Sequence, residues 1–208
     1  MLREILTQFQ DEVMLIEEPV SKKFEISHYI LQYKDRPILF KDVDGWEVTS
    51  NVWSTRERIA KYLGIKKEEI THFMMNAMDS PKPYISVKGA GFFENSTRDF
   101  SLKELPIPQY FLKDGGPYFT SAIYIAKDDN DFVNLSYHRT MVRDEKSATV
   151  RLVPRHLYAM WKEKTEHGEE LDVRIIVGNP IHVLLAASTS PPYGVSELNI
   201  ASSMSEMA

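Results

Sequence analysis

Two prolines flanking a single isoleucine divide this chain into stretches of different character. The segment Glu104-Leu105-Pro106-Ile107-Pro108 closes a polar stretch, residues 94–108, and proline can neither donate a backbone hydrogen bond nor continue a helix. Before this point, helical patterns alternate with short strand patterns, whereas strand patterns dominate after it. We therefore expect an α+β protein with an α/β domain over residues 1–103 and a strand-rich domain over residues 104–208.

Local signals mark the elements of the first half. The Asp44-Gly45 pair favours a two-residue hairpin turn, because both positions must adopt a positive φ. Ser54 and Glu57 have the spacing of a capping box, which predicts a helix that ends at Gly64. The expected elements are helices near residues 2–9, 22–33, 54–64 and 66–78, and strands at residues 13–16, 37–43 and 46–52.

The second half has the pattern of a β-meander. Charged turns at residues 127–131 and 143–146 separate three runs rich in β-branched and aromatic residues. Pro180 can open a short apolar helix, since a proline at the first helical position loses no hydrogen bond. The expected elements are strands at residues 118–126, 132–142, 148–153 and 171–177, and helices at residues 154–167 and after residue 180.

Composition excludes several classes of protein. The 208-residue chain has no cysteine, so it has neither disulfides nor cysteine-ligated zinc. Its formal net charge of -5 argues against nucleic acid as a partner, because phosphate contacts require clustered Lys and Arg. The longest apolar stretch, residues 174–188, is interrupted at Gly178-Asn179-Pro180, so no stable membrane span is expected. The N-terminus does not resemble a signal peptide, and we expect a cytoplasmic protein.

A polar face on one expected strand carries the strongest candidate chemistry. Alternation places Asn134, Ser136 and His138 on one face and Leu135, Tyr137 and Arg139 on the other, which is also typical of any half-buried strand. His156 lies near an expected helix start, as a capping residue or a ligand. Asp114-Gly115-Gly116-Pro117 has the composition of a turn. Glu197 follows prolines and a glycine in an expected loop, where it would be solvated.

Ten short motifs in the same order give the chain a resemblance to one family. The chain resembles the UbiD-type decarboxylases, which use prenylated FMN, from end to end. The matching motifs are Leu2-Arg3-x-x-Leu6 with Pro37-x-Leu39-Phe40, Asn51-x-x-x-Thr55-Arg56-Glu57-Arg58 with Leu63-Gly64, Glu104-Leu105-Pro106-Ile107-Pro108, Asp114-Gly115-Gly116-Pro117-Tyr118, Asn134-x-x-x-x-Arg139, Arg155-His156-Leu157, Gly178-x-Pro180 and Gly194-Val195-x-Glu197.

The resemblance implies roles for individual residues. Asn134, His156 and Glu197 would bind a divalent metal, usually Mn²⁺, that holds the phosphate of prenylated FMN, with K⁺ nearby. Arg139 would be the catalytic residue that faces the flavin and the substrate carboxylate. The remaining positions that the resemblance assigns to cofactor binding are Ser136, Tyr137, His138 and Arg155.

The resemblance also implies a fold and an activity. The second domain would be a split β-barrel like that of flavin reductases, incomplete at its C-terminus. The activity would be a carboxy-lyase acting on an aromatic or α,β-unsaturated acid, such as a quinone-precursor hydroxybenzoate or an isoprenoid-pathway acid. A flavin prenyltransferase would supply the cofactor, and the full-length protein would be a homo-oligomer.

One family feature has no match in the sequence. Family members are roughly twice as long, and their second half carries a Glu-x-Pro-Phe-Gly-Glu-like segment with an acid/base glutamate. Because this chain contains no such segment, we expect it to be inactive alone. The alternative is a stand-alone flavin- or metal-binding module, or a split subunit, without lyase activity of its own.

Overall fold

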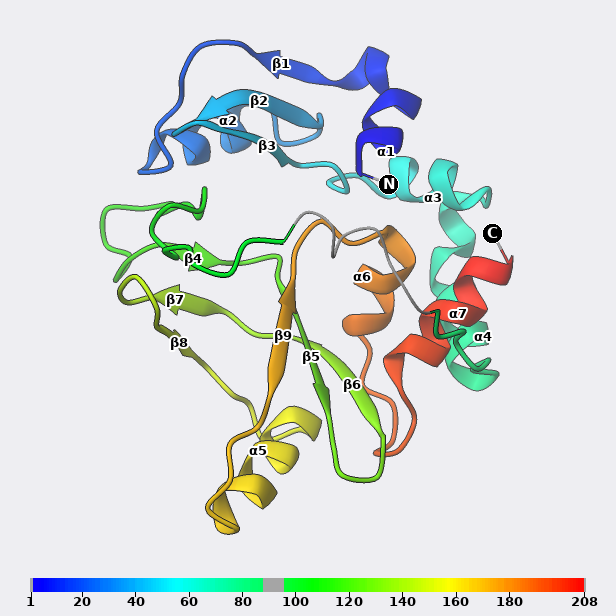
Figure 1. Cartoon of the computed structure of the whole chain (residues 1–208). Coiled ribbons are helices and arrows are strands. Elements are labelled where there is room, and N and C mark those ends of the chain that lie inside the picture. Colours follow the sequence, from blue (N-terminus) through cyan, green and yellow to red (C-terminus); the bar gives the residue numbers. More distant parts are fainter. Residues whose placement is uncertain (1, 88–95, 208) are drawn as a thin grey trace.

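The structure, a computed structural model, describes residues 2–87 and 96–207 (Figure 1). In these ranges the strands form three sheets of three strands, in the orders β1-β2-β3, β4-β7-β8 and β6-β5-β9. The helices are α1 (Leu2–Gln8), η1 (Gln10–Glu12), α2 (Glu25–Gln32), α3 (Arg56–Leu63), η2 (Lys67–Glu69), α4 (Ile70–Asp79), α5 (His156–Glu166), α6 (Ile181–Ala187) and α7 (Glu197–Met207). The strands are β1 (Met14–Ile16), β2 (Ile38–Val43), β3 (Trp46–Ser50), β4 (Tyr118–Phe119), β5 (Ile123–Lys127), β6 (Val133–Tyr137), β7 (Thr140–Val142), β8 (Ala148–Val150) and β9 (Val173–Ile176).

The N-terminal sheet follows the expected pattern. Strand β1 runs parallel to β2, and β2 pairs with β3 in an antiparallel hairpin. Asp44 and Gly45 at the turn have φ values of 49° and 90°, so both occupy the left-handed region that a two-residue hairpin requires. Ile38 and Phe40 of β2 are fully buried, and they pack in one cluster with Ile26 of α2. The α2 helix therefore covers this sheet.

The start of α3 differs from the sequence prediction by one residue. Thr55, not Ser54, is the N-cap: its side-chain oxygen accepts a hydrogen bond from the Arg58 amide at 3.3 Å. The Ser54 hydroxyl instead lies 3.3 Å from the Arg58 guanidinium. The helix ends at Gly64, whose φ of 68° places it in the left-handed conformation typical of a helix C-terminus.

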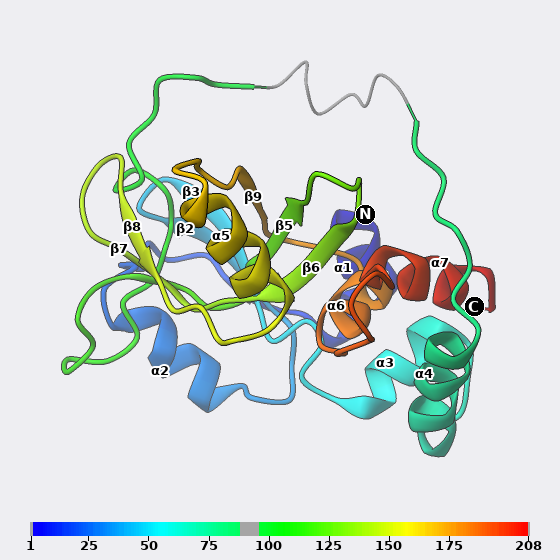
Figure 2. The ribbon, with the colours of Figure 1, turned by 90° about the horizontal axis from the view of Figure 1, so that it is seen from below.

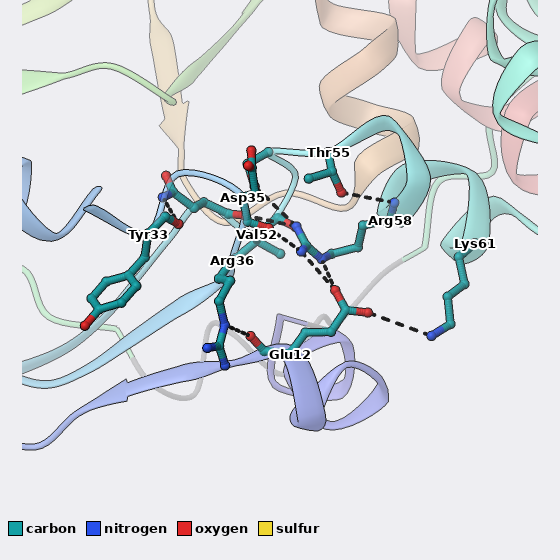
Figure 3. A network of polar contacts seen from close by, with 10 residues as sticks. Glu12, Tyr33, Asp35, Arg36, Val52, Thr55, Arg58 and Lys61 are labelled. Carbon is teal, nitrogen blue, oxygen red and sulfur yellow. Dashed lines mark hydrogen bonds and ion pairs between the residues drawn. The ribbon is translucent and has the colours of Figure 1, made fainter. Parts of the chain in front are cut away.

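A buried arginine joins three segments of the N-terminal region (Figure 3). Only 4% of Arg58 is exposed, and its guanidinium donates to the Asp35 carbonyl at 2.8 Å and the Val52 carbonyl at 3.2 Å. It also pairs with the Glu12 carboxylate, at 3.0 Å from Nε and 2.9 Å from Nη2. The planar guanidinium can satisfy several acceptors at once. The Thr55-Arg56-Glu57-Arg58 motif thus has a structural role at this position.

The expected meander of the second half is divided between two sheets. The run predicted as one strand, residues 132–142, breaks at His138 and Arg139: β6 pairs with β5, whereas β7 pairs with β4 and β8. The Thr140 hydroxyl donates to the His138 carbonyl at 3.1 Å, and this local bond accompanies the break in the ladder. The predicted strand at residues 118–126 divides in the same way into β4 and β5. No closed barrel is present in the part of the chain that the structure describes.

The last helices return to pack on helices of the first half. Figure 2 shows α7 beside α4, and one apolar cluster joins Leu63 and Phe73 to Ile181, Ile200 and Met204. The sequence prediction did not include α7. No helix within the described ranges has the length and apolar character needed to cross a membrane.

Candidate functional site

One face of β6 forms a continuous polar row. Asn134, Ser136 and His138 lie on the same side of the strand, as the alternation predicted. The Ser136 hydroxyl donates to Asn134 Oδ1 at 3.1 Å, and it lies 2.9 Å from His138 Nε2. Asn134 and His138 are buried, with 2% and 9% exposure. The row is therefore an internal hydrogen-bonded network, where burial strengthens electrostatic interactions.

Glu197, which lies near the C-terminal end of the sequence, forms hydrogen bonds with this row. It is the first residue of α7 and is only 2% exposed. Its carboxylate accepts hydrogen bonds from Asn134 Nδ2 at 3.0 and 3.2 Å and from the Leu135 amide at 2.8 Å. The expectation of a solvated loop was wrong, because Ile200 and Met204 anchor α7 in the core and draw its first turn inward.

The third predicted ligand lies beside this carboxylate. His156 begins α5, and its Nδ1 is 3.8 Å from Glu197 Oε1. The rings of Phe132 and Tyr193 contact the imidazole, with centroids 6.0 and 5.3 Å away. Burial, and then the charge of Arg155, lowers the pKa of His156. A neutral imidazole keeps a lone pair, which is the form that binds metal ions.

The buried carboxylate has no strong counter-charge. Burial raises the pKa of Glu197, although hydrogen bonds from the Leu135 amide and Asn134 oppose this shift. Within the described residues, the only basic group within ion-pairing distance is His156. A cation at this point would offset the cost of burying the charge.

The chemistry of the donor set fits a divalent cation. An amide oxygen, an imidazole nitrogen and a carboxylate oxygen are donors that Mn²⁺-like ions accept. No group of three or more His, Cys, Asp or Glu side chains gathers in the described ranges. A cation site in this part of the chain therefore requires another residue type, and Asn134 provides one.

The structure does not bring the other predicted residues into this cluster. Arg139 follows β6 and is exposed, and within the described ranges its side chain makes no hydrogen bond or ion pair. Tyr137 donates its hydroxyl to the Leu184 carbonyl at 3.1 Å, on the side of α6, and burial raises its pKa to about 12. Arg155 donates to the Ser190 hydroxyl, so its side chain is directed to the loop that follows α6.

Several residues at the site gave no clear signal in the sequence. Tyr193 contacts both His156 and Phe132, and its hydroxyl donates to Asp128 at 3.0 Å. Burial raises the pKa of Tyr193 to about 12, and the Asp128 hydrogen bond contributes. Ser196 accepts from the Leu198 amide at 3.2 Å at the start of α7. A serine before apolar residues at helical spacing was the one available signal for this helix.

One cavity in the described part of the chain, of about 430 Å³, is lined by Phe132, Tyr193 and Ser196 and adjoins the cluster. Another, larger cavity of about 630 Å³ lies between β3, the segment around Pro106 and the segment that precedes α6. None of the clustered polar residues lines the larger cavity. We place the functional site at the cluster, because the larger cavity is mostly apolar and offers no comparable set of donors.

Two family models match the chain. The 3-octaprenyl-4-hydroxybenzoate carboxy-lyase N-terminal domain matches residues 6–78. The 3-octaprenyl-4-hydroxybenzoate carboxy-lyase Rift-related domain matches residues 85–208 and therefore includes every residue of the cluster.

Curated relatives and solved structures agree with these models. Anhydromevalonate phosphate decarboxylase of Methanothermobacter thermautotrophicus is 35% identical over 208 residues, which are 99% of this chain and 49% of the relative. The corresponding enzyme of Methanocaldococcus jannaschii is 32% identical over 210 residues, 98% of this chain and 48% of the relative. The UbiD-class enzyme HmfF from Pelotomaculum thermopropionicum, in complex with FMN, has a TM-score of 0.88 at 29% identity, covering 98% of this chain and 48% of that structure.

The chain spans about half the length of the relatives it matches. An evolved dimeric form of HmfF in complex with prFMN also matches this chain over about half of its own length, with a TM-score of 0.89, 29% identity, and coverage of 98% of this chain and 50% of that structure. Together, the two family models and these relatives establish that this chain belongs to the UbiD family.

Proposed function

We propose that this chain is the flavin-binding part of a UbiD-type carboxy-lyase. The observation that carries the proposal is the convergence of Asn134 and His156 on Glu197. Asn134 Nδ2 lies 3.0 Å and His156 Nδ1 lies 3.8 Å from Glu197 Oε1, although the three residues are separated in sequence. In support, the structural relative HmfF is described in complex with FMN and with prFMN.

The three converging side chains would hold Mn²⁺, which in turn would bind the phosphate of prenylated FMN. One carboxylate leaves a net positive charge on the cation for the phosphate to balance. A K⁺ ion is proposed nearby. Prenylated FMN, when bound, supplies the electron sink for the loss of CO2. Cofactor contacts are also proposed for Ser136 and Tyr137 of β6, for His138 and Arg139, which follow this strand, and for Arg155, which precedes α5.

Arg139 is proposed to bind the substrate carboxylate. Its guanidinium is exposed, and within the described ranges it has no carboxylate partner. A permanently charged fork can donate two parallel hydrogen bonds to a carboxylate, which fixes the orientation of the acid as well as attracting it. The role of this chain in the reaction is therefore orientation.

The proposed substrate is an α,β-unsaturated acid. Five relatives that are 30–35% identical carry the description anhydromevalonate phosphate decarboxylase. These relatives support an isoprenoid-pathway acid over an aromatic hydroxybenzoate as the substrate class.

The architecture and context of the whole protein are also proposals. We infer that the sheets β4-β7-β8 and β6-β5-β9 are two parts of a split barrel, with a domain boundary near residues 103 and 104. A flavin prenyltransferase would supply the cofactor in the cytoplasm, and the full-length enzyme would be a homo-oligomer.

An alternative is a binding module or split subunit without lyase activity of its own. The observation that favours it is that the candidate ligands Asn134, His156 and Glu197 come together within this chain. A complementary polypeptide that restores decarboxylation would support the lyase, whereas binding without turnover in the native assembly would support the module.

The direct test is metal-dependent retention of flavin. The chain is incubated with FMN and Mn²⁺ and desalted, and the retained flavin is measured by absorbance. We expect His156→Ala to lose retention, because it removes a ligand to the cation. His72→Ala is the matched control, since His72 is an exposed residue of α4. Equal retention by wild type and His156→Ala would contradict the proposed site.

A further inference from the structure

We propose that Ser136 and His138 are positioning residues that turn the side-chain amide of Asn134, so that its oxygen faces the cation. This inference rests on the cation site proposed above. It gives the two residues a role different from direct contact with the cofactor: they would set the direction of a chain of hydrogen bonds. The evidence is the set of donors and acceptors along β6.

Both ring nitrogens of His138 lie within hydrogen-bonding distance of a partner. Its Nδ1 lies 3.2 Å from the Arg151 carbonyl and its Nε2 lies 2.9 Å from the Ser136 hydroxyl. The ring also meets Tyr124 edge-on, with centroids 5.3 Å apart and an interplanar angle of 81°. A carbonyl can only accept a hydrogen bond, so the contact with Arg151 requires a proton on Nδ1. Burial lowers the pKa of His138, which favours the neutral ring with a lone pair on Nε2.

This tautomer decides what Ser136 can do. A serine hydroxyl has one hydrogen, and the lone pair on His138 Nε2 is an acceptor for it. If Ser136 gives its hydrogen to His138, its oxygen is left to accept from the side-chain amide of Asn134, and only the amide nitrogen can donate. In that arrangement the amide oxygen of Asn134 would point to the opposite side, toward Glu197.

The orientation matters because only the amide oxygen can bind a cation. In the structure Asn134 has the opposite orientation: Nδ2 faces Glu197 at 3.0 and 3.2 Å, and Ser136 donates to Oδ1. This arrangement uses the only hydrogen of Ser136, so a neutral His138 receives none at Nε2. The charge of Glu197 thus favours one orientation of the amide, and His138 favours the other.

Asn134 and Glu197 would both hold the proposed cation, and the carboxylate would then not need the amide nitrogen of Asn134. Asn134 Nδ2 would donate to Ser136, Ser136 to His138, and His138 to the Arg151 carbonyl. We call this chain of hydrogen bonds the relay. Every polar group in the row would then have a complementary partner, a condition that buried polar networks meet. The relay would therefore stabilise the orientation that binds metal.

The experiment measures Mn²⁺ binding to the 208-residue chain by the loss of the free-ion signal in electron paramagnetic resonance. Ser136→Ala and His138→Phe each interrupt the relay, and we expect each to weaken Mn²⁺ binding by about 10-fold or more, the usual effect of losing a partner of a metal ligand. Ser136→Thr keeps the hydroxyl and should restore wild-type binding. Ser147→Ala is the matched control, because within residues 2–87 and 96–207 that hydroxyl bonds only Asp144, in the β7–β8 hairpin.

A second measurement needs no variant. Nitrogen-15 NMR of the imidazole, with diamagnetic Mg²⁺ in the site, should report His138 as the Nδ1–H tautomer. An Nε2–H tautomer under these conditions, or unchanged Mn²⁺ affinity in Ser136→Ala, would overturn the relay. Failure of the wild-type chain itself to bind Mn²⁺ would overturn the cation site and the relay together. Circular dichroism of each variant separates weaker binding from unfolding.

Discussion

The side-chain amide of Asn134 on β6 donates to both carboxylate oxygens of Glu197, at 3.0 and 3.2 Å, although the two residues are 63 positions apart in the sequence. This contact fixes the first turn of α7 against the sheet β6-β5-β9. It also places a buried carboxylate where only His156, among the described residues, is within ion-pairing distance. The local structure of the site thus depends on a charge that a cation would stabilise.

The first prediction concerns Glu197→Gln. Glutamine keeps the volume of the side chain and can still accept from the Leu135 amide, but it removes the buried charge. The metal-free variant should therefore melt at or above the wild-type temperature. In wild type, Mn²⁺ at 100 times its dissociation constant should add about 2.7 kcal/mol to the free energy of unfolding, and the variant should lose this gain. Thermal unfolding followed by circular dichroism, with and without Mn²⁺, checks both expectations. A full Mn²⁺ shift in the variant would exclude Glu197 as a ligand.

The second prediction separates two contributions of Arg58 to stability: its hydrogen bonds to backbone carbonyls and its ion pair with Glu12. Arg58→Met should lower the free energy of unfolding by about 3 kcal/mol, since it leaves the buried Val52 carbonyl and the part-buried Asp35 carbonyl without their donor. Glu12→Gln should cost about 1 kcal/mol or less, because the Glu12 side chain is 40% exposed. Urea denaturation of both variants gives the comparison. Equal losses would mean that the ion pair, and not the pairing of the carbonyls, provides the stability.

The sequence predicted the polar face of β6 because strand alternation depends only on local geometry. The β2–β3 turn could also be predicted, since Asp44 and Gly45 favour the required φ values. The burial of Glu197 could not be predicted, because it follows from the packing of Ile200 and Met204 against Phe73 on α4. The break after Tyr137 was missed for a related reason: the choice of sheet for β7 depends on β4 and β8, which are distant neighbours. The burial of Glu197 and the division of the strand after Tyr137 therefore depend on long-range packing, which local sequence patterns do not report.

The third prediction concerns Arg139→Lys. Because the Arg139 side chain makes no hydrogen bond or ion pair within the described ranges, the stability of the variant should change by less than about 0.5 kcal/mol. In a full-length enzyme with this sequence as its first half, turnover should fall on the order of 100-fold, as expected for a misplaced substrate, while flavin content stays constant. Arg143→Lys, in the exposed β7–β8 turn, is the control. Normal turnover by the Arg139 variant would remove this residue from the carboxylate site.

The last prediction is that the 208-residue chain binds prenylated FMN but does not decarboxylate. Among the described residues, the buried carboxylates are Asp128 and Glu197. Asp128 accepts from the Tyr193 hydroxyl and from the Asn130 and Phe132 amides, and Glu197 would bind the cation. Neither is available to transfer a proton, and general acid–base assistance contributes roughly 10²–10⁴-fold to a rate.

The corresponding assay incubates the chain with prenylated FMN, Mn²⁺ and K⁺ and follows CO2 release from a panel of α,β-unsaturated and aromatic acids. Retained flavin, measured by absorbance after desalting, should be present in wild type and reduced in Glu197→Gln, while CO2 release stays at the background of the unprenylated FMN control. Binding and turnover are then separate properties, because the proposed ligands and Arg139 would serve binding, whereas the two buried carboxyl groups among the described residues, Asp128 and Glu197, are both engaged. Turnover well above this background by the chain alone would show that a group within these 208 residues performs the proton transfer, and Asp128→Asn would then identify or exclude the nearest buried candidate.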